Sequence, residues 1–474
     1  MRYRSTRDPR PEPAMRSFEE VLLAGLAEDG GLYVPETVPR LDLAALAGLP
    51  YGELAARVVG AFAGDSFAAP ELQRLCHAAY DCFRHRAVTP LVQLDHDLWL
   101  LELFHGPTFA FKDLALQLLG RLFDAALARR AERVTIVGAT SGDTGSAALE
   151  ACRDRAAIDI FFLYPHGRIS EVQRRQMTTI DSPNCHAVAI DGNFDDCQDL
   201  VKALFADERL RRELNLSAMN SINFARIAAQ VVYYLAAGLA LGATGRSAGR
   251  SVSFAVPTGN FGNIYAAHLA RAMGLPVERL VLATNANDIL ARYLASGTMT
   301  IAAVDPSLSP SMDIQVASNF ERLLFELKGR NGAAVAQAMA AFRGDGTLPR
   351  DDQAWRAAAA ALAGRRVDDA GTLAEIGRTY KETGLLIDPH SAVAVAAARS
   401  ARGEAGNRPM VALATAHPAK FPEAVERATG VRPALPEPLA DLLDRRERVA
   451  VLPNDIAAVS RFVGERARLR QRAA

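Results

Sequence analysis

The sequence predicts an α/β protein with two open parallel or mixed sheets, each covered by helices on both faces. Two observations support this fold class. From about residue 98 onward, short apolar runs alternate with helical patterns, as in βαβ units. Two of the strand-to-helix turns, at 138–146 and 257–263, are rich in glycine and small polar residues. In parallel sheets such turns lie at the carboxyl edge, where ligands bind.

A helical segment is expected before the alternating region. Ser17 and Glu20 form a capping signature at the start of a helix, and residues 29–35 read as a turn with a short extended segment. Further helices are expected at about 42–48, 52–64, 70–85, 113–130, 143–153, 170–178, 194–206, 224–241 and 262–273. Strands are expected at 98–103, 133–138, 158–164, 186–190, 251–256 and 280–284.

At 474 residues the chain is long enough for several domains. We expect an N-terminal helical segment at 1–95 and two α/β domains, at 96–240 and 241–474, which interleave along the chain. Residues 330–370 are expected to form amphipathic helices. The segment 436–470 also reads as helical, and its last helix begins at 453–455.

Composition excludes several classes of function. Lys+Arg and Asp+Glu both number 54, so no nucleic-acid or anionic-membrane partner is indicated. The five cysteines are odd in number and form no C-x-x-C pair, which favours a reducing, cytoplasmic compartment. No signal peptide is visible, and the uncharged stretch 227–244 reads as a buried helix rather than a membrane span.

Lys112 is the main candidate for chemistry. It stands where a turn becomes a helix, among aromatic residues, and both burial and the positive helix end lower a lysine pKa. Such lysines form Schiff bases, although a lysine at a helix start often simply extends its charge to solvent. Arginine does not form imines, so only five residues could provide amine chemistry. They are Lys112, Lys202, Lys328, Lys381 and Lys420.

The two glycine-rich turns each present several backbone N–H groups at a helix N-terminus, ready for an anion. Neither matches the Walker or the dinucleotide fingerprint. Either could instead be a tight connection only. Two such turns beside a candidate imine lysine indicate a phosphorylated cofactor that stays bound without reacting.

Two further segments could line the same cleft. Ser221, Asn223 and Arg226 supply a hydroxyl, an amide and a guanidinium suited to a phosphate or carboxylate, unless they only cap a helix. Thr415 follows a strand-like run and could point into the cleft or bond its own backbone. The histidines show no metal-ligand spacing, so no metal site is predicted; the ones considered as catalytic are His105, His390 and His417.

At this point a resemblance becomes specific. The segment HGPTFAFKD at 105–113 resembles the pyridoxal-phosphate attachment motif of the threonine synthase family. Similar motifs span nearly the whole chain: YRSTR at 3–7, DGGLYVP at 29–35, TSGDTG at 140–145, GNFGN at 259–263, AHPAKF at 416–421 and VLPND at 451–455. The resemblance implies fold type II of the pyridoxal-phosphate enzymes, like the tryptophan synthase β chain, with an added N-terminal segment.

The resemblance also implies roles for individual residues. Lys112 would carry pyridoxal 5'-phosphate as a Schiff base, act as the base at Cα, and be the catalytic residue. Thr415 would bind the pyridine nitrogen, and Asp143 would lie near the cofactor where many relatives have Asn. The turn made of Gly259, Asn260, Phe261, Gly262 and Asn263 would hold the cofactor phosphate. Substrate contacts would come from Thr140, Ser141, Thr144, Ser221, Asn223, Arg226 and Lys420.

The implied activity is a lyase reaction of amino-acid biosynthesis, in which O-phospho-L-homoserine and water give L-threonine and phosphate. The alternatives are another fold-type II lyase, such as a threonine/serine dehydratase or a phospho-amino-acid lyase, and a non-catalytic relative that binds a phosphorylated ligand. A monomer and a homodimer are both compatible with the sequence.

Overall fold

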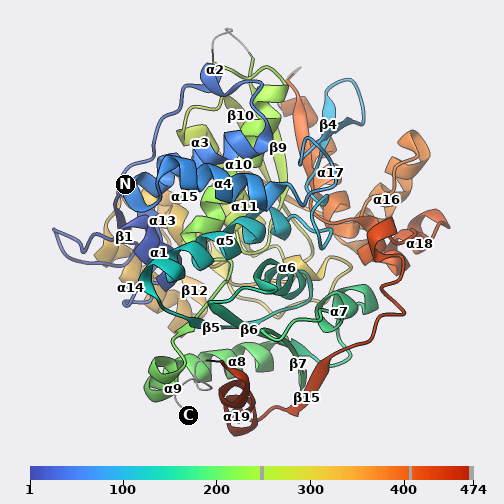
Figure 1. The fold of residues 1–474 in the computed structure, drawn as a ribbon. Helices are drawn as coiled ribbons and strands as arrows, with labels where there is room; N and C mark the ends of the chain where they lie inside the picture. The colour runs from blue at the N-terminus through green and yellow to red at the C-terminus, as the bar shows by residue number, and fades with distance from the viewer. Residues whose placement is uncertain (246–249, 405–407, 469–474) are drawn as a thin grey trace.

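The computed structural model describes residues 1–245, 250–404 and 408–468, and two sheets dominate it (Figure 1). The larger sheet has the strand order β13-β10-β9-β14-β4-β3, with only β3 antiparallel to its neighbour. Its strands are β3 (Leu91–Gln93), β4 (Leu98–Glu102), β9 (Val252–Pro257), β10 (Val277–Thr284), β13 (Ala363–Arg366) and β14 (Met410–Ala414).

The smaller sheet is parallel throughout, with the order β15-β7-β6-β5-β8. Its central strand is buried along its whole length, which explains why the sequence shows a continuous apolar run there. The strands are β5 (Val134–Ala139), β6 (Ile158–Pro165), β7 (Cys185–Asp191), β8 (Leu216–Ser217) and β15 (Val449–Pro453). Together the two sheets confirm the predicted fold class.

Helices cover both faces of each sheet. Helices α8 (Phe194–Ala206) and α19 (Ile456–Arg466) pack on one face of the smaller sheet, at the bottom of Figure 1. Between the sheets, α5 (Lys112–Arg130) contacts both α6 (Asp143–Cys152) and α10 (Phe224–Ala240). Helix α17 (Pro389–Ala401) covers the far face of the larger sheet, so α5 is placed at the centre of the molecule.

The N-terminal segment is mainly helical, as expected, and packs against this centre. The predicted capping box is present: the Ser17 side chain accepts from the Glu20 N–H at the start of α1. Helices α3 and α4 contact α10 and α5. The segment contains β1 (Tyr3–Ser5), α1 (Phe18–Ala24), β2 (Tyr33–Pro35), α2 (Leu43–Leu46), α3 (Tyr51–Ala63) and α4 (Ala69–Tyr80).

Two strands pair in a sheet other than the one formed by most of their own expected domain. Strand β4 precedes residue 240 yet pairs with β14 in the larger sheet. Strand β15 lies near the end of the chain yet pairs with β7 in the smaller sheet. Each sheet is therefore built from distant parts of the chain.

The prediction of helices throughout 330–370 is wrong in part. Strand β12 (Thr347–Leu348) separates helix α14 (Gly332–Asp345) from helix α15 (Asp352–Ala361), and strand β13 follows α15. Strand β13 has the sequence AGRR and lies at the edge of the sheet, so it lacks the apolar pattern of a buried strand.

The helical reading of 436–470 is also wrong for 449–453, which form β15. This is a short edge strand with alternating exposure. It lies beside a helical segment, so its own short alternation reads as part of the helical pattern. The remaining elements are α7 (Glu171–Thr178), α9 (Glu208–Glu213), α11 (Gly262–Ala272), α12 (Ile289–Ser296), β11 (Met299–Thr300), α13 (Phe320–Leu327), α16 (Asp369–Thr383), α18 (Pro422–Thr429) and five short 3-10 turns.

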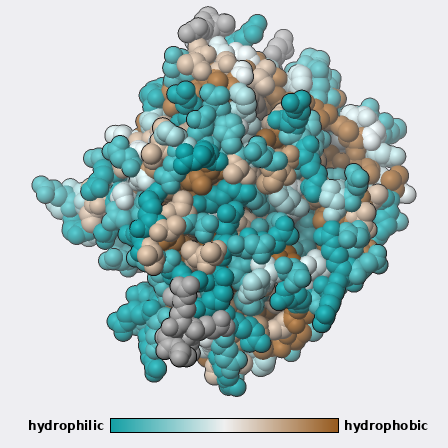
Figure 2. Space-filling model, viewed as in Figure 1, coloured by the Kyte–Doolittle hydropathy of each residue, from teal (hydrophilic) through white to brown (hydrophobic). Residues whose placement is uncertain are grey.

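The stretch 227–244 lies largely in α10, which is buried along most of its length, as expected. Among the residues that the structure describes, no helix is both long and apolar enough to cross a membrane. The face drawn in Figure 2 is mainly hydrophilic, with hydrophobic residues lying between hydrophilic ones.

Candidate active site

Lys112 is the first residue of α5 and forms part of the wall of a central pocket. The residue is 8% exposed, and its Nζ atom lies 3.4 Å from Oδ2 of Asp143. Burial lowers the pKa of Lys112; Asp143 raises it, and the charges of Arg226 and Lys420 lower it again. The net lowering makes this amine available as a nucleophile or base.

The loop before Lys112 is joined to the end of β14. The Phe111 N–H donates to the carbonyl oxygen of Thr415 at 2.8 Å, and Ala110 forms a bridge with Ala416. As a result, Thr415 lies in the same pocket wall as Lys112. The Thr415 N–H in turn donates to Oγ of Ser391, on α17, at 3.1 Å.

The turn between β9 and α11 forms another part of the pocket wall. A Cβ atom at Gly259 would lie 2.8 Å from the carbonyl oxygen of Ser311, so glycine is required for this close approach. Phe261 adopts a left-handed conformation, with φ of 65°, directly before α11. The first N–H groups of α11 lack partners within the helix, and with the helix dipole they favour a bound anion.

Asp143 begins α6 and contacts two lysines. Its Oδ1 atom lies 2.8 Å from Nζ of Lys420 and accepts from Gln173 at 2.9 Å, while its Oδ2 atom faces Lys112. Burial alone would raise the pKa of Asp143, but the ammonium groups of Lys420 and Lys112 outweigh this effect and hold the pKa well below its ordinary range. Asp143 is therefore ionised in the site.

Three polar atoms of this pocket wall are buried and have no hydrogen-bond partner among the residues that the structure describes: Nη1 of Arg226, Oε1 of Gln230 and Nδ2 of Asn263. The Asn263 amide is fixed in this orientation because its Oδ1 accepts from the hydroxyls of Tyr233 and Tyr234. Burial lowers the pKa of Arg226 to about 10. Unpaired buried polar groups are costly, so the two nitrogen donors indicate a ligand with anionic or other acceptor oxygens, and Oε1 of Gln230 calls for a donor group on the same ligand.

The structure brings most of the predicted site residues to this one pocket, namely Lys112, Asp143, Thr144, Ser221, Arg226, Gly259, Asn260, Phe261, Gly262, Asn263 and Thr415. Four predicted residues are not part of its wall. Oγ1 of Thr140 accepts from the N–H groups of Gly142 and Gly145. Ser141 lies in that same turn, half-buried.

Asn223 and Lys420 have partners of their own. Asn223 caps α10 and donates to the carbonyl oxygen of Leu22 at 2.8 Å. Lys420 is 1% exposed and donates to the carbonyl oxygen of Thr108 at 2.9 Å, besides its contact with Asp143. The substrate contacts assigned to these residues stay predictions.

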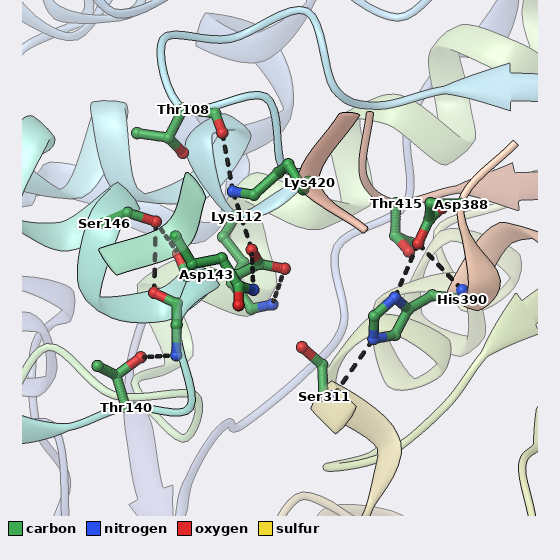
Figure 3. Close-up of polar contacts among 12 residues, drawn as sticks. Thr108, Lys112, Thr140, Asp143, Ser146, Ser311, Asp388, His390, Thr415 and Lys420 are labelled. Carbon is green, nitrogen blue, oxygen red and sulfur yellow. Dashed lines mark hydrogen bonds and ion pairs between the residues drawn. The ribbon is translucent and has the colours of Figure 1, made fainter. Parts of the chain in front are cut away.

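Sequence reasoning missed some residues of the pocket. From the sequence, His390 is considered as catalytic but is not assigned to the site; here its Nδ1 lies 2.7 Å from Oδ2 of Asp388 and its Nε2 accepts from the Ser311 N–H at 3.2 Å, as Figure 3 shows. Ser311 and Met312 come from a loop far away in the sequence. Besides His390, Gln230 gave a signal in the sequence, as a polar residue within an apolar helix.

Comparisons with known proteins cover the whole chain. A family model described as "Threonine synthase N terminus" matches residues 2–80, "Pyridoxal-phosphate dependent enzyme" matches 83–416, and "Threonine synthase, C-terminal" matches 391–463. The chain is 56% identical over 469 residues to a threonine synthase of Pseudomonas aeruginosa and 43% identical over 478 residues to that of Corynebacterium glutamicum; each alignment covers 98% of both chains.

Comparison with solved structures gives the same family as the sequence matches. A PLP-bound threonine synthase from Brucella melitensis matches with a TM-score of 0.94 and 50% identity, covering 99% of this chain and 100% of that one. Threonine synthase from yeast matches with a TM-score of 0.92 and 37% identity over 98% of both chains.

Proposed function

Because the chain belongs to the threonine synthase family, we propose that the pocket around Lys112 is the active site of this pyridoxal-phosphate-dependent lyase. The observation that carries the proposal is the position of Lys112. A buried lysine with a lowered pKa shares one pocket with the amide-rich turn at the start of α11. The substrate is O-phospho-L-homoserine, which is converted with water to L-threonine and phosphate.

The residues present fit pyridoxal 5'-phosphate. Lys112 supplies the amine that holds the cofactor, and the turn 259–263 supplies backbone N–H groups for its phosphate. The hydroxyl of Thr415 is a neutral partner for the ring nitrogen, and Asp143 lies beside Lys112. When bound, the cofactor supplies an electrophilic carbon and a ring that accepts electrons from the substrate.

Lys112 has a second role once substrate occupies the pocket. Its amine removes the proton from Cα and later returns a proton to the same carbon. A lowered pKa suits both steps, since a general base works best with a pKa near the working pH. The aromatic ring of Phe111 next to Nζ, at 5.0 Å, helps to exclude water from the amine.

Arg226 is the residue suited to the departing phosphate. Its guanidinium is buried, and its Nη1 has no partner in the described part of the chain, so a phosphate oxygen would satisfy it. Ser221 lines the same part of the pocket. Thr144 lies in the first turn of α6, where the helix N-terminus favours the substrate carboxylate.

The full-length match to threonine synthases favours this reaction over that of a dehydratase or a phospho-amino-acid lyase. Retention of Lys112 argues against a non-catalytic relative that only binds a phosphorylated ligand. We also propose that the enzyme works in the cytoplasm as a monomer or homodimer, which light scattering would distinguish.

The test is to measure phosphate and threonine released from O-phospho-L-homoserine, with and without added cofactor. Activity should require the cofactor, and borohydride should fix it on Lys112. Lys112→Ala should abolish turnover, while the exposed control Lys202→Ala should behave as wild type. A colourless protein that binds no added cofactor would refute the proposal, and 2-oxobutanoate in place of threonine would identify a dehydratase.

A further inference from the structure

Three charged side chains from distant parts of the chain meet beside the pocket (Figure 3). Asp143 lies between two lysines, with Oδ1 at 2.8 Å from Lys420 and Oδ2 at 3.4 Å from Lys112. All three residues are buried. Lys112 and Asp143 line the pocket, whereas Lys420 does not. One carboxylate thus serves two amines, of which only one faces the pocket.

The two amines are held unequally. Nζ of Lys420 donates to the carbonyl oxygen of Thr108 at 2.9 Å and pairs closely with Asp143. The Lys420 N–H is bonded as well, at the end of the 3-10 turn Pro418–Lys420. Within the described ranges, the polar contacts of Lys112 are the longer one to Asp143 and the one to the ring of Phe111. Lys420 is therefore the better site for the positive charge that balances Asp143.

We propose that Lys420 is a positioning residue that does not contact the substrate phosphate. Its ammonium group pairs with the carboxylate of Asp143, and this allows Lys112 to lose its proton. The proposal rests on the proposed function, in which Lys112 acts as a neutral amine. It replaces the substrate contact expected for Lys420 from the sequence with an action through Asp143.

The charges around Lys112 determine the direction of the effect. Asp143, on α6, favours the ammonium form of Lys112, while Lys420, after β14, and Arg226, on α10, disfavour it. Without the charge of Lys420, a like charge is lost and the carboxylate of Asp143 is left to Lys112 alone. Both changes stabilise the ammonium form, so Lys112 would deprotonate at higher pH.

The experiment measures this proton directly in the cofactor-free protein. Cyanate carbamylates only neutral amines, and its rate at each lysine can be followed by peptide mass spectrometry across a pH series. With five lysines in the chain, the peptides are easily assigned. Lys202, whose side chain is 72% exposed, serves as the internal reference.

Lys420→Gln should move the midpoint of Lys112 labelling upward by about one pH unit or more, the usual effect of a nearby charge. Lys420→Met should do the same. Lys420→Arg keeps the charge, so its midpoint of Lys112 labelling should lie close to that of the wild type. Asp143→Asn should lower it. Melting curves show which variants are folded at the pH of labelling.

An unchanged midpoint in folded Lys420→Gln would overturn the proposal. Lys420 would then have a structural role only, linking the 3-10 turn to Thr108. If the midpoint is unchanged and KM for the phosphorylated substrate rises, Lys420 contacts the substrate, which also overturns it. Should neither neutral variant fold, an unchanged midpoint in Asp143→Asn overturns it instead. The labelling midpoints and melting curves need no turnover, so failure of the proposed function would be seen separately.

Discussion

Replacing Arg226 by methionine should make the ligand-free protein more stable, although it removes a residue of the proposed active site. Burial lowers the pKa of Arg226 from its ordinary value of about 12.5 to about 10. One pKa unit corresponds to about 1.4 kcal/mol, so the buried charge costs about 3 kcal/mol. A lowered pKa in a cation means that folding disfavours the charged form, and this cost is fully present at neutral pH.

Arg226→Met removes the charge and keeps much of the side-chain volume, so the melting temperature should rise by an amount equivalent to about 1–3 kcal/mol. Inorganic phosphate should raise the melting temperature of wild type, because it pairs with the free guanidinium. It should not stabilise the variant. Scanning fluorimetry with and without phosphate measures both effects.

Arg322 provides a matched control of opposite sign. Burial also lowers its pKa to about 10. However, its guanidinium donates to the carbonyl oxygens of Tyr33 and Ile222 and to Oδ1 of Asn319. Arg322→Met would leave these acceptors unpaired and should lower the melting temperature. The reasoning is refuted if Arg226→Met melts below wild type, or if phosphate stabilises both proteins equally.

Two other substitutions test the walls of the site. Gly259→Ala should weaken binding of the cofactor, because its Cβ would meet the Ser311 carbonyl, and such overpacking costs about 1–3 kcal/mol; titration of the cofactor-free protein measures this, with Gly344→Ala, where the space is open, as control. Asn223→Ala should lower the melting temperature by the equivalent of about 1 kcal/mol, the usual value of a helix cap. A raised KM at an unchanged melting temperature would instead support a direct contact with substrate.

Local signals in the sequence were sufficient for most of the fold. Strand and helix periodicities located most elements from β4 to β10, although not the short helix α9 or the short strand β8, and the capping box at Ser17 located α1. Such patterns depend on residues that are neighbours in the sequence. They failed for β13 and β15, because an edge strand shows little of the burial that produces a pattern.

The sequence by itself determined the chemistry of the site: a lysine at a helix start, two amide-rich turns and a strand-end threonine are each defined by adjacent residues. Only the tertiary structure decided which groups satisfy one another. Lys420 pairs with Asp143 across 277 residues, while Nη1 of Arg226 has no partner among the residues described. The physical reason is that hydrogen bonds and ion pairs depend on distances of a few ångströms, and contacts between distant segments leave no period in the sequence.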